Sequence, residues 1–563
     1  LKPLWPQVPR AHPRRPPEPL KMAPARRTAL AVLAASAALA AGRPKPPRVI
    51  EPQNPSAPER LPEGEKRRVL VAGAGLAGLS AALELAERGV EVTVREAASY
   101  VGGRLNSRPV KVDVPHGEEP FMVEHGFHAW FHNYWTFKDI RARLDIDHYF
   151  RKWGAVHYVF KDYKPEQLIS KGPYPLNMIG IIERSPNLNM TDTIRSLLML
   201  PDIVGFDYDK VYDLYDNITF IEWGKMRKVA KPFFDIVFSP TLSVTLNERQ
   251  VMSAAEMLMY QQLYFLSDPR ADEREVATED YYTAVLGPWV QRLKTLGVNI
   301  SLSDTVRGLR LGVDNGAVDE TGRHWDDVIV ATDMLGVQSI MNTTELAAGS
   351  SDRLAEVRDA VNSIPIAPAY KVARVWFDKQ LTRACSTDAG CPDIMETPDF
   401  SPVNLIAQYH LLENQFATWA NKTGGSVIEF HCYTWTLGDL ADDEVWKAIA
   451  PTVHQVYPEI LDDGWKALAV HVNSYQNFPS FRTGTNQRRP DSDFAMRSGV
   501  PHLFFAGDWL RPSFPAALME RAVATGRQAA NHVLLKYGVR QVPVKVTSSH
   551  GPGVIEDTQE IVV

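Results

Sequence analysis

The sequence predicts an α/β fold, in which the strands of a parallel β-sheet alternate with helices. Two stretches carry this prediction. Residues 69–94 have the pattern of a short apolar strand, a glycine-rich turn, a helix and a second strand, which is the order of a βαβ unit. Residues 501–535 repeat the order of strand, glycine and helix near the other end of the chain. With 563 residues, 45% of them hydrophobic, the chain can form several such units with large cores.

The overall composition excludes several classes of protein. A formal net charge of −6 argues against a nucleic-acid-binding protein, whose domain normally carries a basic face. Three cysteines are too few for a disulfide-built scaffold or for a zinc ribbon with cysteine ligands.

The first 66 residues differ from the rest. Residues 1–50 contain ten Lys or Arg against one acid, so they carry +9 and leave −15 on the remainder. Arg26 and Arg27 precede an apolar run at 29–41, which is shorter than the ~20 residues of a transmembrane helix. This pattern, with small residues at 38–40, predicts a targeting segment followed by a disordered Pro-rich linker up to residue 66. A disordered tail without targeting function is the alternative.

The first strand, Val69–Ala72, leads into the turn Gly73-Ala-Gly75-Leu76-Ala77-Gly78. Gly73 permits the tight turn, Gly75 lets the backbone approach a pyrophosphate, and Gly78 lets helix and strand pack closely. The helix that begins here offers its free N–H groups to the phosphates. The turn therefore predicts a dinucleotide site.

The residues after the second strand specify the dinucleotide further. Glu96 lies where a carboxylate accepts a hydrogen bond from a ribose hydroxyl, which favours NAD or FAD over NADP. Gly102, Gly103 and Arg104 follow at once. Paired glycines allow close approach to the cofactor and an arginine neutralises its pyrophosphate, which favours FAD. A plain surface turn is the alternative for the two glycines.

A third motif begins after the strand-like run 501–505. Gly507 and Asp508 precede a helix that starts at Pro515 and runs to about Leu535. Asp508 is a candidate acceptor for a ribityl hydroxyl, and the helix dipole would stabilise negative charge on a reduced flavin ring. Asp508 as a simple helix cap, and Gly526 as a packing glycine, are the alternatives.

Together these motifs resemble the flavin-containing amine oxidase and phytoene desaturase superfamily. The string FFAGDWLRPSFPAALMERAVATGRQAAN at 504–531 is most similar to carotenoid desaturases, nearest to the isorenieratene synthase-like desaturase/methyltransferases. The string MVEHGFHAWFHNYW at 122–135 is similar to the segment that those enzymes place after the first flavin motif.

The resemblance implies a Rossmann-like FAD-binding domain with an inserted α+β substrate domain. The FAD-binding domain would combine residues 67–130, 287–341 and 481–540. Residues 131–286 and 342–480 would form the substrate domain, and 541–563 a C-terminal tail. The motifs and the resemblance together imply these cofactor-binding residues: Gly73, Gly75, Leu76, Ala77, Gly78, Glu96, Gly103, Arg104, Gly126, Phe127, His128, Val306, Thr332, Gly507, Asp508, Ala517, Leu518, Met519 and Ala522.

Two features bear on the substrate class. Amine oxidases of this superfamily place a lysine after the strand that corresponds to 328–332, where it holds a water against the flavin, and residues 333–352 contain no Lys or Arg. Residues 252–266 are instead rich in Met, Leu and aromatics, which predicts either a slot for a long hydrocarbon or plain core. The aromatic and histidine cluster at 127–135 is either beside the flavin or a packed corner. A metal site of His125, His128 and His132 lacks a fourth ligand, so no metal is predicted.

The resemblance implies desaturation, ring aromatisation or isomerisation of a carotenoid or related isoprenoid. Glu520 and His128 are the candidate catalytic residues, as groups that stabilise a substrate cation or remove its proton. An amine oxidase releasing peroxide, and a non-catalytic flavoprotein-fold subunit that binds pigment or a protein complex, are the alternatives.

The expected partners are a hydrophobic polyene, a membrane surface and a membrane protein complex, but no nucleic acid. The N-terminal segment predicts export or delivery to an organelle, with the plastid and its thylakoid favoured and a bacterial periplasm or membrane surface as the alternative. In an oxidising compartment Cys385 and Cys391 would close a small loop; elsewhere they would be two thiols.

Overall fold

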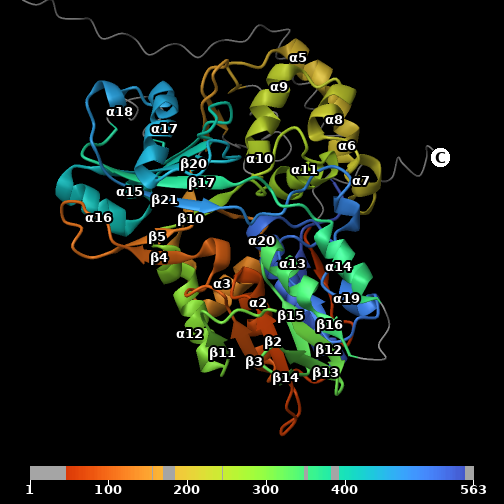
Figure 1. The fold of residues 1–563 in the computed structure, drawn as a ribbon. Coiled ribbons are helices and arrows are strands. Elements are labelled where there is room, and N and C mark those ends of the chain that lie inside the picture. The colour runs from red at the N-terminus through yellow and green to blue at the C-terminus, as the bar shows by residue number, and fades with distance from the viewer. Residues whose placement is uncertain are drawn as a thin grey trace, which may run out of the picture.

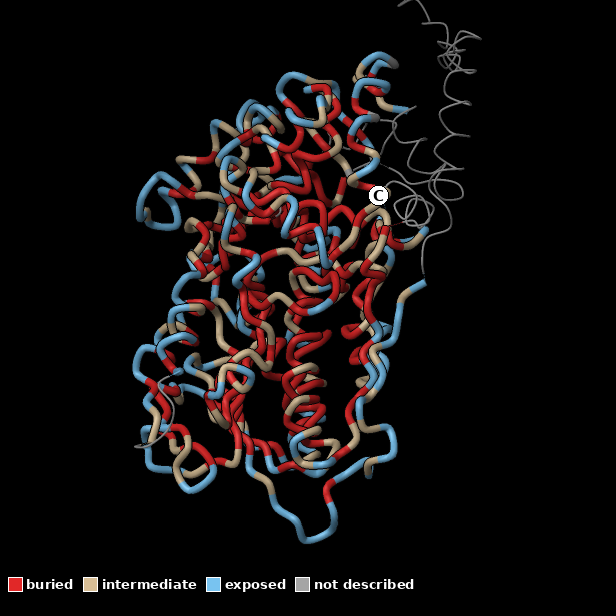
Figure 2. The backbone as a smooth tube through the Cα atoms, turned by 90° about the vertical axis from the view of Figure 1, so that its right-hand side faces the viewer, coloured by how far each residue is buried: buried red, intermediate tan, exposed pale blue. Residues whose placement is uncertain are grey.

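The computed structural model of the chain describes residues 46–154, 156–168, 184–243, 245–347, 353–381 and 392–551. The apolar run at 29–41 and the cysteines Cys385 and Cys391 lie outside the described residues. The lower half of Figure 1 contains a parallel sheet with helices on its faces, and the upper half contains a mixed, mainly antiparallel sheet and a group of helices. Buried backbone concentrates in the helices and strands at the centre of each half, while exposed loops lie at the periphery (Figure 2).

The parallel sheet has five strands from three distant stretches of the chain, in the order β11-β3-β2-β15-β22. All of its pairings are parallel, with β2 at the centre, paired to β3 and β15. Because the middle and C-terminal strands extend the sheet begun by the N-terminal βαβ unit, the three stretches form one unit. The strands are β2 (Arg68–Ala72), β3 (Glu91–Arg95), β11 (Asn299–Ser301), β15 (Asp327–Val330) and β22 (Leu503–Phe505).

Two helices cross against each other on one face of this sheet: α2 (Leu76–Glu87) and α20 (Leu518–Lys536). Their close approach depends on glycine, because a Cβ on Gly526 would stand 2.2 Å from the Ala77 carbonyl oxygen. A Cβ on Gly78 would stand 2.0 Å from the Gly73 carbonyl oxygen. Helix α12 (Gly287–Thr295) packs beside α2.

The other face of the sheet packs against a smaller sheet and three helices. The sheet has the order β14-β13-β12-β16, with β12 (Leu309–Val313), β13 (Gly316–Asp319), β14 (His324–Trp325) and β16 (Glu345–Leu346). The helices are α13 (Met334–Thr343), α14 (Leu354–Asn362) and α19 (Phe494–Arg497). Helix α14 was expected in the substrate domain, but Val357 and Val361 bury into the same core as Val337 of α13 and Leu503 of β22. Its apolar face therefore belongs to the parallel-sheet unit.

The upper unit is built on a seven-stranded sheet of the order β21-β17-β20-β19-β18-β8-β9. Helix α17 (Asp442–Val456) covers one face, where its residues Val445 and Ile449 pack on Val375 and Phe377. The other face is directed at the parallel-sheet unit (Figure 1). The strands are β8 (Val156–Tyr158), β9 (Glu166–Leu168), β17 (Tyr370–Phe377), β18 (Ile394–Glu396), β19 (Leu405–Gln408), β20 (Ser426–Cys432) and β21 (Ala467–Tyr475).

A three-stranded sheet, β6-β10-β7, and a helical group complete the upper unit. The strands are β6 (Trp130–Phe131), β7 (Phe150–Trp153) and β10 (Arg274–Ala277), with β4 (Ser107–Val110) and β5 (Phe121–Glu124) forming a separate hairpin. The helices are α5 (Met190–Ser196), α6 (Leu200–Val204), α7 (Tyr208–Tyr215), α8 (Phe220–Met226), α9 (Lys231–Phe233), α10 (Ser239–Ser243), α11 (Ala254–Gln261), α15 (Tyr409–Leu412), α16 (Asn414–Thr423) and α18 (Glu459–Asp462). Helix α3 (Trp135–Leu144), expected in the substrate domain, instead packs on α20 and α12 in the lower half of Figure 1. Within the described ranges no helix combines the length and the apolar composition needed to cross a bilayer.

The expected linker up to residue 66 and the expected tail from 541 are wrong for the described parts of both. Strand β1 (Arg48–Ile50) pairs antiparallel with β23 (Val544–Val546). The Asn54 amide donates to the Val539 carbonyl at 2.8 Å, and Leu61 is buried in the main core. The proline-rich composition hid this order, because the two segments bury their apolar surface against each other and against distant parts of the chain.

Candidate active site

A cavity of about 480 Å³ lies between the parallel-sheet unit and the open face of the seven-stranded sheet. Glycines and the N-termini of two helices line one part of it, and aromatic side chains line the rest, which we call the aromatic chamber. Of the residues expected to bind a cofactor, these line the cavity: Gly73, Gly75, Leu76, Ala77, Glu96, Gly103, Arg104, Gly126, Phe127, His128, Val306, Thr332, Gly507, Asp508, Leu518, Met519 and Ala522.

Two expected cofactor residues do not line the cavity. Gly78 lies against the Gly73 carbonyl and the Val71 side chain, so its role is the close packing of helix on strand. Ala517 is fully buried and acts as the N-terminal flanking residue of α20. Each of the two residues lies in its expected motif, but the preceding residue Ala77, in the first case, and the following residue Leu518, in the second, line the cavity instead.

The glycine-lined part is shaped for a phosphate-bearing group. Gly73 has φ of +105°, and a Cβ there would stand 2.7 Å from the Ala331 carbonyl oxygen. At Gly75 no described atom lies within 4 Å of a Cβ position, so the backbone borders open space. No described side chain caps the N-terminus of α2, so its first N–H groups remain available to an anion.

Glu96 stands at the end of β3, beside this turn. Its carboxylate accepts from the backbone N–H of Ala74 at 2.7 Å and of Ala98 at 2.8 Å. These two bonds fix the carboxylate at the edge of the cavity, where a ribose hydroxyl can donate to it.

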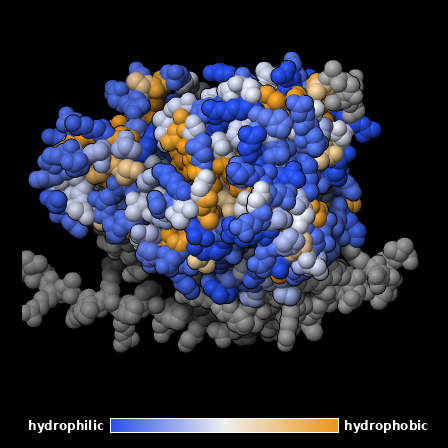
Figure 3. Space-filling view, turned by 90° about the horizontal axis from the view of Figure 1, so that it is seen from below, coloured by the Kyte–Doolittle hydropathy of each residue, from blue (hydrophilic) through white to orange (hydrophobic). Residues whose placement is uncertain are grey.

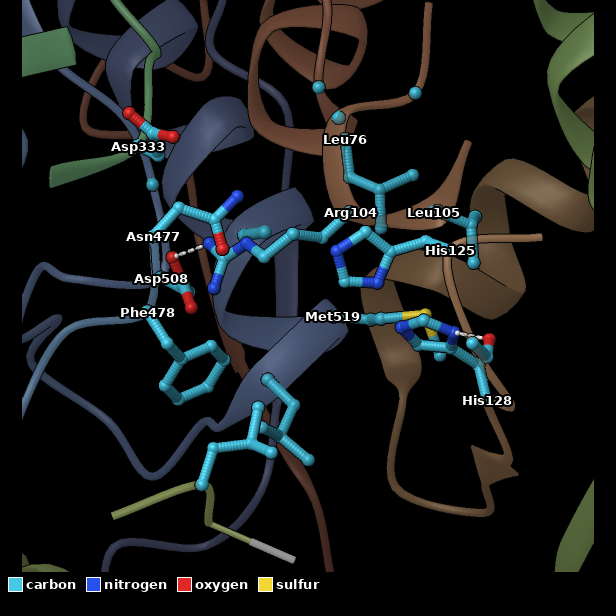
Figure 4. A pocket seen from close by; sticks show the side chains of 18 of the residues that line it. Leu76, Arg104, Leu105, His125, His128, Asp333, Asn477, Phe478, Asp508 and Met519 are labelled. Atoms are coloured by element: carbon cyan, nitrogen blue, oxygen red, sulfur yellow. Dashed lines mark hydrogen bonds and ion pairs between the residues drawn. The ribbon is translucent and has the colours of Figure 1, made fainter. Parts of the chain in front are cut away.

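Arg104 and Asp508 meet across the cavity from opposite ends of the chain. The guanidinium donates to Asp508 at 2.5 Å and lies over the Phe478 ring at 4.8 Å (Figure 4). Its second terminal nitrogen, Nη1, is buried with no partner among the described residues, as is Thr332 Oγ1. Buried polar groups normally find partners, so these two atoms point to a polar ligand in this part of the cavity.

The N-terminus of α20 opens on the same cavity. Its first residue, Leu518, has φ of +50°, and Leu518, Met519 and Ala522 line the cavity. No side chain in the described part of the chain caps this terminus. Negative charge that develops on a bound ring beside it is stabilised by the helix dipole.

Side chains from other parts of the chain fix the backbone of the segment Gly126–His128 by hydrogen bonds. The Phe127 N–H donates to Glu429 at 2.9 Å, and the His128 N–H donates to the Tyr281 hydroxyl at 2.8 Å. His128 Nδ1 lies 2.8 Å from the Gly126 carbonyl, which can only accept, so Nδ1 carries the hydrogen and Nε2 remains an acceptor. Burial lowers the pKa of His128 to about 4, so the ring is neutral at neutral pH.

A buried charge network supports this segment. Arg374 donates to Glu124 at 2.6 Å and to Glu429 at 3.0 Å, and His431 contacts Glu429 at 2.7 Å. Burial alone would raise the pKa of Glu429, but Arg374 and His431 outweigh it and bring the pKa to about 2. The ionised Glu429 can therefore hold the Phe127 N–H in a fixed position.

The expected catalytic role of Glu520 is wrong. Its side chain does not line the cavity; it accepts from the backbone N–H groups of Thr136 at 2.7 Å and Phe137 at 3.1 Å. Glu520 thus caps the N-terminus of α3. Burial raises its pKa to about 7. Its place next to Met519 suggested the cavity, but successive residues of a helix point in different directions.

The aromatic chamber is lined largely by residues that were expected only as members of the substrate domain. The methionines at 252, 257 and 259 are core residues, buried outside the lining, while Tyr264 and Phe265 do line the chamber. Of the cluster at 127–135, Trp130 and His132 pack elsewhere. Sequence reasoning missed the following lining residues: Trp153, Tyr158, Leu246, Arg274, Tyr370, Val372, Glu396, Leu405, His431 and Tyr433.

No lysine lines the cavity among the residues that the structure describes. Lys371 lies between the lining residues Tyr370 and Val372, but strand alternation turns it to the opposite face, where it donates to Ser474 at 2.7 Å. The described residues also contain no group of His, Cys, Asp or Glu that could hold a metal ion.

The donor set of the cavity fits FAD. Two uncapped helix N-termini face it, an acid stands at the ribose position, and unpartnered atoms of Arg104 and Thr332 lie between them. Fold and site thus define a flavin-dependent oxidoreductase. The family model for flavin-containing amine oxidoreductases matches residues 76–534, and the chain belongs to that family.

Two curated relatives are named carotenoid phi-ring synthase. The protein from Chlorobaculum tepidum is 25% identical and covers 86% of this chain and 91% of its own length. The protein from Streptomyces griseus is 28% identical and covers 85% and 89%. Among solved structures, a putrescine oxidase bound to putrescine superposes with a TM-score of 0.59 at 13% identity, over 84% of this chain and 99% of that one, which shows a shared fold.

Proposed function

We propose that this FAD-dependent oxidoreductase acts on a carotenoid or related isoprenoid, by desaturation, ring aromatisation or isomerisation. The observation that carries the proposal is the aromatic chamber, which opens directly onto the cofactor part of the cavity. Such walls suit a hydrocarbon substrate. The two relatives named carotenoid phi-ring synthase support the same class of substrate.

The residues of the chamber have separable roles in this chemistry. FAD, when bound, supplies the acceptor for a hydride from the substrate. Aromatic rings that line the chamber can stabilise positive charge on the polyene. The neutral His128, with Nε2 free to accept, is positioned to take the proton that leaves next.

The two alternatives have less support. An amine oxidase of this superfamily would be expected to use a lysine at the flavin, and none of the described lining residues is a lysine. A non-catalytic subunit would be expected to have lost its cofactor contacts or filled its chamber. Here the cofactor part retains Glu96, Arg104 and Asp508, and the cavity measures about 480 Å³.

The test is turnover of defined pigments by the purified, FAD-loaded protein. Acyclic, monocyclic and dicyclic carotenoids would be supplied in lipid vesicles, and the products separated by chromatography and identified by mass. Loss of two or four hydrogens, or an isomer of unchanged mass, supports the proposal and identifies the reaction. Peroxide release from amines without any change in the carotenoids would support the amine oxidase alternative instead.

We also propose that the chain works at a membrane surface after delivery to an exported or organellar compartment, with the plastid thylakoid favoured and a bacterial periplasm as the alternative. Large apolar side chains on the helical group are half exposed or more, at Ile194 (50%), Leu198 (54%), Leu214 (64%) and Met226 (51%). Apolar exposure of this kind suits an interfacial helix face. By contrast, the face seen in Figure 3 is mostly hydrophilic, with a hydrophobic band near its centre and smaller hydrophobic patches elsewhere.

The membrane proposal is tested by flotation of the protein with lipid vesicles. Leu198→Ser with Leu214→Ser should reduce the floated fraction, whereas Leu302→Ser, an exposed leucine outside the helical group, should not. Equal flotation of both would contradict the proposal. Fractionation of native cells tests the compartment and any association with a membrane protein complex.

A further inference from the structure

One row of side chains crosses the seven-stranded sheet and lines the chamber from end to end. Val372, His431, Leu405, Glu396 and Tyr158 are register partners on neighbouring strands, and all of them line the cavity. At ~4.8 Å per strand, Glu396 lies ~14 Å from Val372.

The row starts at the cofactor. A Cβ on Gly126 would stand 3.3 Å from Val372 and 3.1 Å from the His431 ring, so these residues back the Gly126–His128 segment. Glu396 and Tyr158 lie two and three strands beyond His431. A group bound at Glu396 therefore belongs to the substrate and not to FAD.

A second row faces this end of the chamber from the three-stranded sheet. Arg274 pairs with Phe131 on one side and Trp153 on the other. Its guanidinium lies 5.5 Å from the centre of the Phe131 ring and 5.3 Å from that of Trp153. Glu396, Tyr158 and Arg274 form a polar end of the chamber: Glu396 and Tyr158 are register partners on β18 and β8, and Arg274 lines the same cavity.

This polar end has unused hydrogen-bonding capacity. Glu396 is only 7% exposed, yet its Oε2 has no partner in the described part of the chain, and neither has Arg274 Nε. Burial raises the pKa of Glu396 to about 8, so the carboxyl keeps its proton at neutral pH. Polar atoms that are buried without a hydrogen-bond partner cost free energy, and a pure hydrocarbon substrate would leave Glu396 Oε2 and Arg274 Nε unpaired.

We propose that the polar end formed by Glu396, Tyr158 and Arg274 binds a hydroxyl group of the substrate, so that the preferred isoprenoid is a hydroxylated one. A hydroxyl both donates and accepts, and can therefore pair with Glu396 and with Arg274 Nε at once. Sites built to hydrogen-bond a hydroxyl discriminate strongly against the analogue that lacks it. The proposal rests on the proposed function, because it assumes an isoprenoid in the chamber.

The test is a competition between two matched pigments. Lipid vesicles with equal amounts of β-carotene and its ring-hydroxylated derivative zeaxanthin are incubated with the FAD-loaded full chain, and the pigment retained by the protein is extracted and quantified. We expect zeaxanthin to be retained about tenfold over β-carotene, which corresponds to about 1.4 kcal/mol. Glu396→Leu and Arg274→Met should each bring the ratio close to one.

The control variant is Ile406→Val, which changes a residue of β19 that packs in the core on the other face of the sheet and should keep the preference. If Glu396→Leu fails to fold, Arg274→Met alone tests the hydroxyl site, because it removes the N–H group that would donate to the substrate hydroxyl. Equal retention of both pigments by the unaltered protein would overturn the hydroxyl site and leave the proposed function standing. Retention of neither pigment would also overturn the hydroxyl site, while the proposed function would still be decided by turnover of the acyclic and monocyclic carotenoids.

Discussion

The contact between α2 and α20 sets the positions of both helix N-termini at the cavity, and a single methyl group tests it. In Gly526→Ala the new Cβ would stand 2.2 Å from the Ala77 carbonyl oxygen, whereas ordinary contact begins at 3.4 Å. The helices would have to separate by roughly 1 Å, and overpacking of this kind costs about 1–3 kcal/mol. Alanine gains about 1 kcal/mol in helix propensity over glycine, which offsets part of the loss.

Because the contact is with backbone, the upper end of this cost applies and leaves a net loss of about 2 kcal/mol. Since the unfolding entropy is about 2.1 cal/mol/K per residue, the unfolding temperature of so long a chain should fall by about 2 °C. Calorimetry measures unfolding, and the rise in flavin fluorescence during heating measures release of FAD. Gly154→Ala is the matched control, since no described atom lies within 4 Å of its Cβ position, and it should stay within about 0.5 kcal/mol of the unaltered protein. If Gly526→Ala unfolds at or above the original temperature, the inferred closeness of the helices is wrong.

Three further predictions concern the buried titratable groups. Glu520→Gln should keep turnover while losing about 0.5–2 kcal/mol of stability, as expected of a helix cap; a large loss of turnover in the folded variant would restore its catalytic role. His128→Ala should retain FAD, seen by its absorption spectrum, and lose about 10²–10⁴-fold in turnover; an unchanged rate would exclude it as the proton acceptor. The pKa of the Glu396 carboxyl is raised to about 8, so the folded protein holds the carboxyl proton more tightly than the unfolded chain does. The stability that this proton contributes to the fold is therefore complete below the pKa of the unfolded chain and is lost as the pH rises through 8. Urea titrations from pH 5 to 8 should therefore show a steeper fall in stability for the unaltered protein than for Glu396→Gln, by up to about 1.4 kcal/mol per pH unit, and parallel curves would contradict the buried, protonated carboxyl.

The cofactor part could be predicted because its chemistry is local in sequence. The turn from Gly73 to Gly78, the acid Glu96 and the pair Gly507–Asp508 each follow a strand at short, fixed spacing. Positive φ requires glycine at positions 73 and 507, and close backbone contact requires it at 78, so the residue type itself carries the information.

The chamber could not be predicted in the same way, because strand pairing joins residues that are far apart in sequence. Glu396 and Tyr158 are neighbours only through the parallel pairing of β18 with β8. The methionines of α11 were indistinguishable from lining residues by pattern, since a helix buried on all sides and one that borders a cavity are equally apolar. The predicted role of Glu520 was wrong for a related reason: the sequence predicted its helix, but not the direction in which this one side chain points.

The buried charge network that supports Gly126–His128 shows what ion pairs beside a hydrophobic chamber can contribute. Ion pairs such as Arg374 with Glu124 and Glu429 are a weak source of stability, because removing the charges from water costs about as much as their attraction returns. Here these ion pairs fix the position of a backbone segment. Arg374 lies on β17 and Glu429 on β20, and the carboxylate of Glu429 accepts from the Phe127 N–H, so the network fixes the segment between β5 and β6 against the seven-stranded sheet. A chamber that binds its substrate mainly through non-directional apolar contacts gains its geometry from such directional bonds outside its walls.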